Sequence, residues 1–142
     1  MSCRTYFSKR LNLVLEIIED RIDVNSLIEL KAVHVKNGNV DEKTKVLAFS
    51  DADVPLKSAE ISQLGERLTR ELPQYAKAPT VIVTRQIGAT ASTMKLAKDV
   101  SKKQRMGVFA TVEPALAFLD IHYEDLVEEF PEAVPTILRY DD

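Results

Sequence analysis

TVIVT, residues Thr80–Thr84, carries an apolar or β-branched side chain at every position. Such a short run, apolar on both faces, is typical of a strand that is covered on both sides. We therefore predict a central strand in which Val81 and Val83 are buried and Ile82 lies on the opposite face. A similar run, KVLAF at Lys45–Phe49, predicts a second buried strand.

Strand and helix patterns alternate on either side of this run. Period-two alternation over 11–18 predicts a strand with one well-buried face, paired in a hairpin with a shorter strand before it. Steps of three and four predict helices between the later strands. The sequence thus predicts an α/β fold, a mixed β-sheet of about five strands with four helices, with strands at about 4–7, 11–18, 45–49, 80–84 and 106–110 and helices at about 23–37, 59–72, 93–104 and 111–121.

The pattern of the first helix leaves two interpretations open. Asp23 is a suitable N-cap and Gly38 a suitable C′ residue, but Lys31 interrupts the apolar face. The Asn-Gly pair at its end is also a hairpin signal, which would make Ala32–Val35 a strand. We prefer the helix because Leu27–Leu30 does not alternate.

Two segments carry a family resemblance. KVLAFSDADVPLKSAEISQLGERL, Lys45–Leu68, and VFATVEPALAFLDI, Val108–Ile121, resemble the STAS domain superfamily, and most closely its divergent bacterial SpoIIAA-like (STAS/SEC14-like) proteins. The resemblance covers roughly residues 4–121. It implies a STAS-like α/β domain at 1–121 that acts as a regulatory or protein-interaction module.

The resemblance also implies candidate contact residues. Antagonist proteins of that superfamily are phosphorylated on a serine at the junction of a loop and the second helix, and Ser58 falls near that position. The acid before it and the glycine after it are absent here, where the sequence reads Leu-Lys-Ser-Ala. We expect Ser58 to act mainly as a helix N-cap. Ser50 and Ser58 are the candidates for phosphorylation or partner contact.

A second candidate site is the polar turn after the TVIVT strand. A helix N-terminus offers free N–H groups and a favourable dipole to anions. Gly88, Thr90 and Ser92 are therefore candidate anion or ligand contacts, and the alternative is that Ser92 or Thr90 simply caps the helix. We find no catalytic motif, because the sequence has no Gly-x-Ser-x-Gly, Walker or Gly-x-Gly-x-x-Gly pattern. We find no metal site, because His34 and His122 stand far apart. We expect no cofactor.

Composition narrows the class of protein. The chain has 142 residues, a net charge of −3 and one cysteine, Cys3. Mild acidity argues against nucleic acid as a partner, since that affinity depends on clustered Lys and Arg. A lone cysteine, which we interpret as incidental near a frayed terminus, is typical of a reducing compartment, so we expect a cytoplasmic protein. No apolar run approaches 18 residues, so we expect no integral membrane protein.

The last segment, 122–142, reads as an addition to the domain: a short acidic helix at 123–130 and then an extended tail interrupted by Pro131 and Pro135. Its apolar residues are too many for a solvated tail. We expect this segment to pack on the domain or on a partner subunit. An extended arm of this kind favours a homodimer, and the alternative is an arm that covers an edge of its own sheet.

The function that best fits these features is a non-catalytic STAS-like regulatory or protein-interaction module. The alternative is a module that binds a small apolar ligand or a lipid, as the STAS/SEC14-like resemblance implies. An enzyme with an unrecognised site comes third, because it rests only on the turn at Gly88.

Overall fold

The computed structural model describes residues 3–19, 23–41, 43–50, 58–76, 78–85 and 106–141. This part of the chain is an α/β fold, as the sequence predicts. The helix expected at 93–104 lies outside the described residues. The elements are β1 Cys3–Ser8, β2 Leu13–Ile18, α1 Val24–Lys36, β3 Lys45–Ser50, α2 Ser58–Glu71, α3 Pro73–Ala76, β4 Thr80–Val83, β5 Met106–Phe109, α5 Val112–Leu119, α6 Tyr123–Glu129, the 3-10 turn η1 Pro131–Ala133 and α7 Val134–Leu138.

The five strands form one mixed sheet in the order β1-β2-β3-β4-β5. The β1–β2 pair is the predicted antiparallel hairpin, with Ser8 opposite Leu13. Every other neighbouring pair is parallel, as strand–helix–strand crossovers require. The tight hairpin turn places Asn12 in the left-handed region at φ 49°, a conformation that asparagine tolerates better than most residues.

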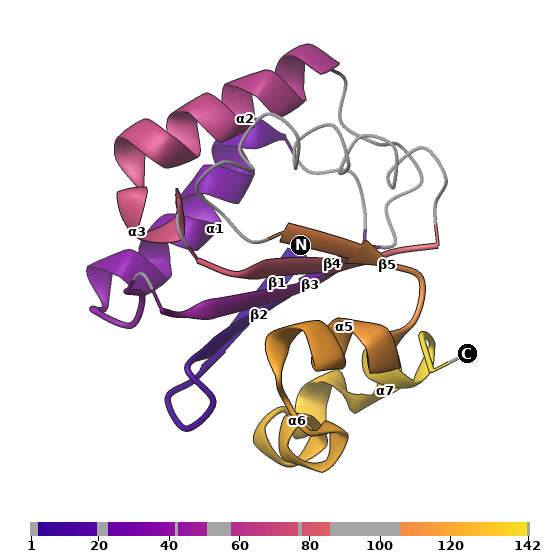
Figure 1. Cartoon of the computed structure of the whole chain (residues 1–142). Coiled ribbons are helices and arrows are strands. Elements are labelled where there is room, and N and C mark those ends of the chain that lie inside the picture. Colours follow the sequence, from indigo (N-terminus) through magenta and orange to yellow (C-terminus); the bar gives the residue numbers. More distant parts are fainter. Residues whose placement is uncertain are drawn as a thin grey trace.

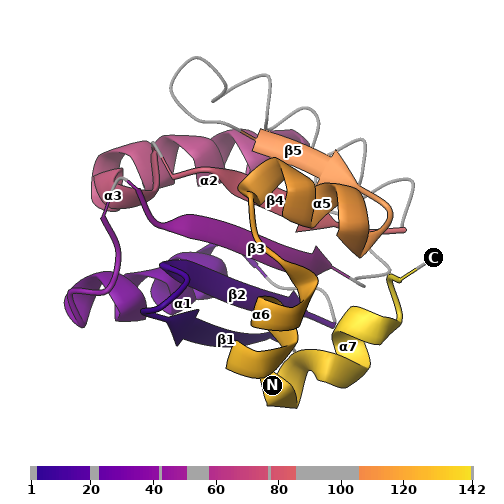
Figure 2. The same ribbon diagram turned by 60° about the horizontal axis from the view of Figure 1, so that its bottom comes forward.

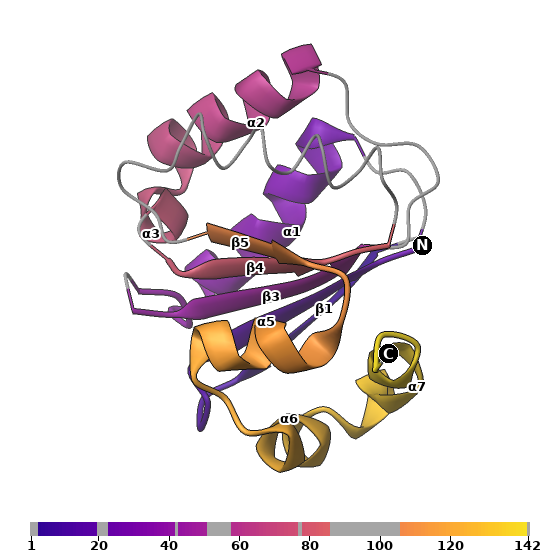
Figure 3. The same ribbon diagram turned by 45° about the vertical axis from the view of Figure 1, so that its right-hand side comes forward.

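Helices cover both faces of the sheet. α1 and α2 lie over one face, and α5, α6 and α7 lie over the other (Figure 1). Figure 3 shows the sheet nearly edge-on between α1 and α5. Two apolar cores result, one beneath each layer. The core beneath the C-terminal helices includes Leu13, Leu15, Ile17, Leu47, Phe49, Val81, Val83, Leu116, Leu126, Phe130 and Ile137.

β4 matches the expectation for the TVIVT run. Val81 and Val83 are fully buried, and they belong to the core beneath the C-terminal helices. Ile82 is half-buried, and its side chain faces the opposite side because successive residues of a strand alternate.

β2 differs from its expectation of one well-buried face. Val14 and Glu16, on the second face, are as buried as Leu13 and Leu15 on the first. The reason is that α1 covers the second face, and Lys31 of α1 pairs with the Glu16 carboxylate there. The period-two pattern therefore identified the strand but underestimated how much of it is covered.

α1 is a helix, and the rival strand at Ala32–Val35 is wrong. The Asp23 carboxylate accepts a hydrogen bond from the Ser26 backbone N–H at 2.8 Å, so Asp23 is the predicted N-cap. Gly38 has φ 73°, and its N–H donates to the Val35 carbonyl at 3.0 Å. A left-handed glycine in this place ends helices because it lacks a Cβ.

Ser58 and Thr111 stand at the starts of α2 and α5. α2 begins at Ser58 itself, and the Ser58 side chain lies outside what the structure describes. Thr111 occupies the N-cap position of α5 but makes no capping hydrogen bond with its side chain. Asp120 ends α5 in the left-handed conformation, at φ 56°.

The C-terminal segment corrects the expectation of an extended tail. Residues after Phe130 form η1 and α7, with Pro131 and Pro135 in their first turns. Proline is tolerated there because the first backbone N–H groups of a helix have no intrahelical acceptor. Leu126, Phe130 and Ile137 are buried against the chain's own sheet, so they no longer motivate arm exchange in a homodimer.

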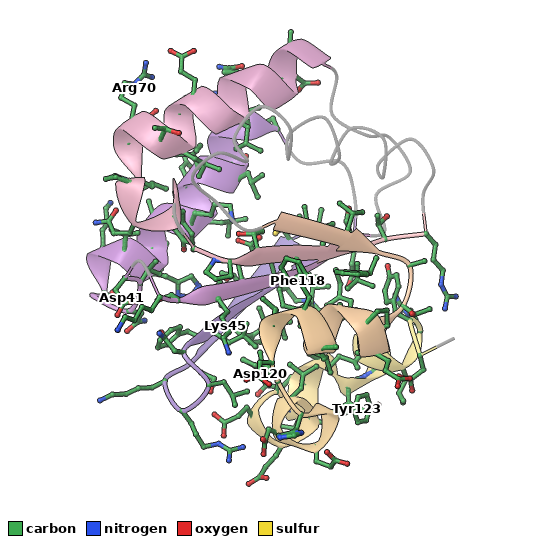
Figure 4. All side chains as sticks on the ribbon, viewed as in Figure 1. Asp41, Lys45, Arg70, Phe118, Asp120 and Tyr123 are labelled. Carbon is green, nitrogen blue, oxygen red and sulfur yellow. The ribbon has the colours of Figure 1, made fainter. Side chains whose placement is uncertain are left out.

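Polar contacts hold this segment in place. The Arg10 guanidinium of the hairpin turn donates to Glu129 at 3.0 Å and to Asp125 at 3.3 Å, both on α6. In Figure 2, α6 lies by β1 and β2, whereas α5 lies by β4 and β5. The Tyr123 hydroxyl, on α6 in Figure 4, donates to Asp141 at 3.4 Å. These contacts hold α6 to the β1–β2 hairpin at one side and to Asp141 at the other.

We predict that Val83→Asp prevents folding. The substitution would bury an unpaired carboxylate, at a cost of several kcal/mol that is comparable to the total stability of a domain. Val33→Asp is the matched control, because Val33 is 48% exposed on α1. Circular dichroism and urea unfolding should show a folded control and an unfolded Val83→Asp chain. A cooperatively folded Val83→Asp protein would contradict the placement of β4.

A second prediction tests the C-terminal helices. Ile137 is fully buried and Leu138, beside it, is 54% exposed. Ile137→Ala should lower the free energy of unfolding by about 2–5 kcal/mol, as expected for a cavity in a packed core. Leu138→Ala should change it by less than about 0.5 kcal/mol. Equal effects of the two substitutions would mean that α7 does not pack on the sheet.

Candidate functional site

The parallel strands end together at one edge of the sheet. β3 ends at Ser50 and β4 ends at Val83, and Arg85 follows two residues after β4. In open α/β sheets, ligands bind beyond the carboxyl ends of the strands at the point where the strand order reverses. The order β1-β2-β3-β4-β5 has no reversal, so the contacts of the residues themselves have to identify a site here. We call the described residues Ser50, Arg85 and Tyr140 the carboxyl-edge cluster.

Tyr140 joins the parts of this cluster. Its hydroxyl donates to the Ser50 carbonyl at 3.4 Å, and its ring lies 5.3 Å from the Phe49 ring, centroid to centroid. The Arg85 guanidinium lies over the same ring, 5.5 Å from the centroid. The Val112 N–H donates to the Tyr140 carbonyl at 2.9 Å. Tyr140 therefore contacts both Ser50, at the end of β3, and the Arg85 guanidinium, which follows β4.

The structure places only one of the two candidate serines in this cluster. Ser50 is the last residue of β3 and is half-buried. Ser58 is the first residue of α2, and its side chain lies outside the described residues. Gly88, Thr90 and Ser92 also lie outside the described residues. The cluster gains Arg85 and Tyr140, which the sequence did not single out as site residues.

A second polar group lies buried under α1. We call it the polar cluster; it consists of side chains from β1, β2, α1 and α3, namely Cys3, Thr5, Glu16, Lys31, His34 and Tyr75. The Lys31 ammonium donates to the Glu16 carboxylate at 2.9 Å. Both side chains are less than 10% exposed, at 9% for Lys31 and 6% for Glu16. A buried charge needs such a partner, because desolvation of an unpaired ion is very costly.

Tyr75 contacts Lys31 through both its ring and its hydroxyl. The Lys31 ammonium lies 4.8 Å from the centroid of the Tyr75 ring, within the range of a cation–π contact. The Tyr75 hydroxyl donates to the Lys31 carbonyl at 3.0 Å, which ties α3 to α1. Burial, with a smaller contribution from the Glu16 carboxylate, raises the pKa of Tyr75, so its hydroxyl stays protonated.

His34 lies one helical turn beyond Lys31. It is 7% exposed, so its ring is buried between the helix and the sheet. Its Nε2 lies 2.7 Å from the Thr5 hydroxyl oxygen of β1, and its ring lies 6.2 Å from that of Phe7. Burial lowers the pKa of His34; the Glu16 carboxylate opposes this effect and the Lys31 ammonium adds to it.

Cys3 corrects the expectation of a frayed end. It is 3% exposed on β1, and its thiol is free. Burial and then the nearby Glu16 carboxylate raise the pKa of the Cys3 thiol to about 11, although Lys31 acts in the opposite direction. The thiolate is the nucleophilic form, so a thiol that stays protonated at neutral pH is inert.

The polar cluster is thus built for packing. Its charges neutralise each other, its thiol and phenol stay protonated, and all of its members except the half-buried Thr5 are buried. No three His, Cys, Asp or Glu side chains in the described part of the chain stand close enough to hold a metal ion. The sequence signal for the pair was present: Lys31 interrupts the apolar face of α1, and Glu16 interrupts the apolar pattern of β2.

Comparisons with protein-family models, with curated proteins and with solved structures give no match to this chain. Within the described ranges, no helix is long and apolar enough to cross a lipid bilayer.

We predict that Lys31→Met lowers the free energy of unfolding by about 3–5 kcal/mol, because it leaves the buried Glu16 carboxylate without its partner. The double variant Glu16→Leu/Lys31→Met should recover most of that loss, since buried ion pairs are often replaceable by packed apolar side chains. Urea unfolding at neutral pH measures both effects.

The control is the exposed pair of Glu66 and Arg70 on α2, whose charged atoms are 3.3 Å apart. Figure 4 shows Arg70 pointing away from the sheet. Glu66→Gln should leave the unfolding midpoint unchanged, because exposed pairs contribute little. If Lys31→Met is as stable as the wild type, the pair does not anchor α1.

Proposed function

We propose that this chain is a non-catalytic, STAS-like regulatory or interaction module that binds a protein partner at the carboxyl-edge cluster. The order of strands and helices and the resemblance of Lys45–Leu68 to STAS domains support this assignment. The proposal also makes the protein a cytoplasmic one, in keeping with a single buried thiol.

The observation that carries the proposal is the convergence of Ser50, Arg85 and Tyr140. These residues come from three distant parts of the sequence, and contacts to the Tyr140 ring and hydroxyl bring them together. Arg85 is exposed, and Ser50 is half-buried. Arginine is enriched at protein interfaces because it combines a large contact area with directed polar groups. Tyr140 is itself buried, so it supports Ser50 and Arg85 from beneath and offers no contact of its own.

The state of the polar cluster supports the non-catalytic part of the proposal. A catalytic acid, base or nucleophile has to reach a substrate and to have a pKa suited to its task. Cys3 and Tyr75 have raised pKa values and are buried, and Glu16 and Lys31 bind each other. These groups therefore serve the packing of α1 on the sheet.

Site-specific photo-crosslinking tests the proposal. A photoreactive amino acid at position 50, in the full chain and in a lysate of the source organism, should capture one reproducible partner. Arg85→Glu in the same chain should reduce that capture at least tenfold, a loss of about 1.4 kcal/mol of binding free energy. Crosslinked products are identified by mass spectrometry.

Position 36 provides the control, because Lys36 is exposed at the far end of α1. A crosslinker there should not capture the partner, and Lys36→Glu should leave capture at position 50 intact. Capture of the same proteins from both positions, or no loss with Arg85→Glu, would contradict the proposal. Native mass spectrometry that finds a co-purifying apolar ligand instead would favour the ligand-binding alternative.

A further inference from the structure

His34 ties α1 to the edge strand of the sheet. β1 is the first strand in the sheet order, and Thr5 of β1 lies opposite Glu16 of β2. The His34 ring reaches across from α1, with Nε2 2.7 Å from the Thr5 hydroxyl oxygen and the ring against Phe7. This contact links α1 to β1 across one face of the hairpin.

The second nitrogen of the His34 ring, Nδ1, is buried without a hydrogen-bond partner among the described residues. A neutral imidazole leaves one nitrogen as a donor and the other as an acceptor, so one bond to the Thr5 hydroxyl satisfies Nε2 in either tautomer. A protonated imidazole carries N–H groups on both nitrogens. The N–H at Nδ1 would then be a buried, charged donor without an acceptor, which is costly.

The charges around the ring do not remove this cost. The titratable groups of the polar cluster are Glu16 from β2, Lys31 from the same helix, Cys3 from β1 and Tyr75 from α3. The Glu16 carboxylate is the only anion among them, and it already accepts a hydrogen bond from the Lys31 ammonium. Cys3 and Tyr75 are neutral at physiological pH.

We propose that the contact of His34 with β1 is pH-sensitive: protonation of His34 on mild acidification loosens the packing of α1 against the edge strand β1. This role is separate from partner binding at the carboxyl-edge cluster. The sensing group is the ring itself, and the element that responds is the contact between α1 and the β1–β2 hairpin.

The direction of the effect follows from linkage. The pKa of His34 is lowered in the folded protein, so the unfolded chain binds the proton more tightly. The contribution of neutral His34 is therefore complete above the unfolded value, about 6.5, and is lost as the pH falls toward the folded value. For each unit by which the pKa of His34 in the folded protein lies below its pKa in the unfolded chain, acidification raises the unfolding equilibrium constant up to tenfold.

The experiment measures urea unfolding of the full chain between pH 7.5 and 5.5. The wild-type midpoint should fall on acidification, and His34→Gln, which keeps a polar group but cannot take up a proton, should remove most of that fall. His122→Gln is the matched control, because His122 is exposed and should leave the fall intact. Hydrogen exchange should show the earliest loss of protection in α1 and β1.

A second measurement does not depend on the variants folding. An NMR titration of the wild-type His34 ring should give a pKa below 6.5. A His34 pKa at or above 6.5 would overturn the proposal. The same fall in midpoint for wild type and His34→Gln would overturn it as well, and neither outcome would bear on crosslinking at Ser50.

Discussion

The structure depends on the burial of both faces of its sheet. The central strands β2 and β3 are covered above and below, with Leu15 and Leu47 facing one core and Val14 and Val46 facing the other. Burial of apolar surface is the main favourable term in folding, so a sheet of this kind needs two layers of helices. α1 and α2 form one layer, and the chain after β5 forms the other. The C-terminal helices are therefore a part of the core.

The two faces of the sheet hold different parts of the molecule in place. The face under α1 contains the Glu16–Lys31 pair, whose burial requires α1 to dock in one register, and it places His34 against the edge strand. The opposite core carries the chain end to the carboxyl edge, where Tyr140 contacts Ser50 and Arg85. The same packing that completes the second core thus orders the surface that we propose to bind a partner.

Local signals in the sequence predicted most of the strands and helices, whereas contacts between distant residues could not be predicted from it. Period-two and three-four patterns gave the five strands and the helices α1, α2, α5 and α6, and Asp23 and Gly38 gave the ends of α1, because these signals act within a few residues. Lys31 looked like a flaw in the apolar face of α1, and Glu16 fitted the alternation of its strand, so neither residue predicted the other across separate elements. Pro131 and Pro135 suggested an extended tail because a first-turn proline and a helix-breaking proline look alike in sequence. Of the site, only Ser50 was predicted; Arg85 and Tyr140 meet through tertiary packing.

Native-state hydrogen exchange tests most directly whether the C-terminal helices belong to one cooperative core. The amides of Leu126 in α6 and Ile137 in α7 should exchange with the free energy of global unfolding, as should those of Leu15 and Leu47 in the central strands. Exchange of the two helical amides through a much less costly local opening, with β2 and β3 still protected, would contradict this account. The C-terminal segment would then be an appendage to a core that is complete without it.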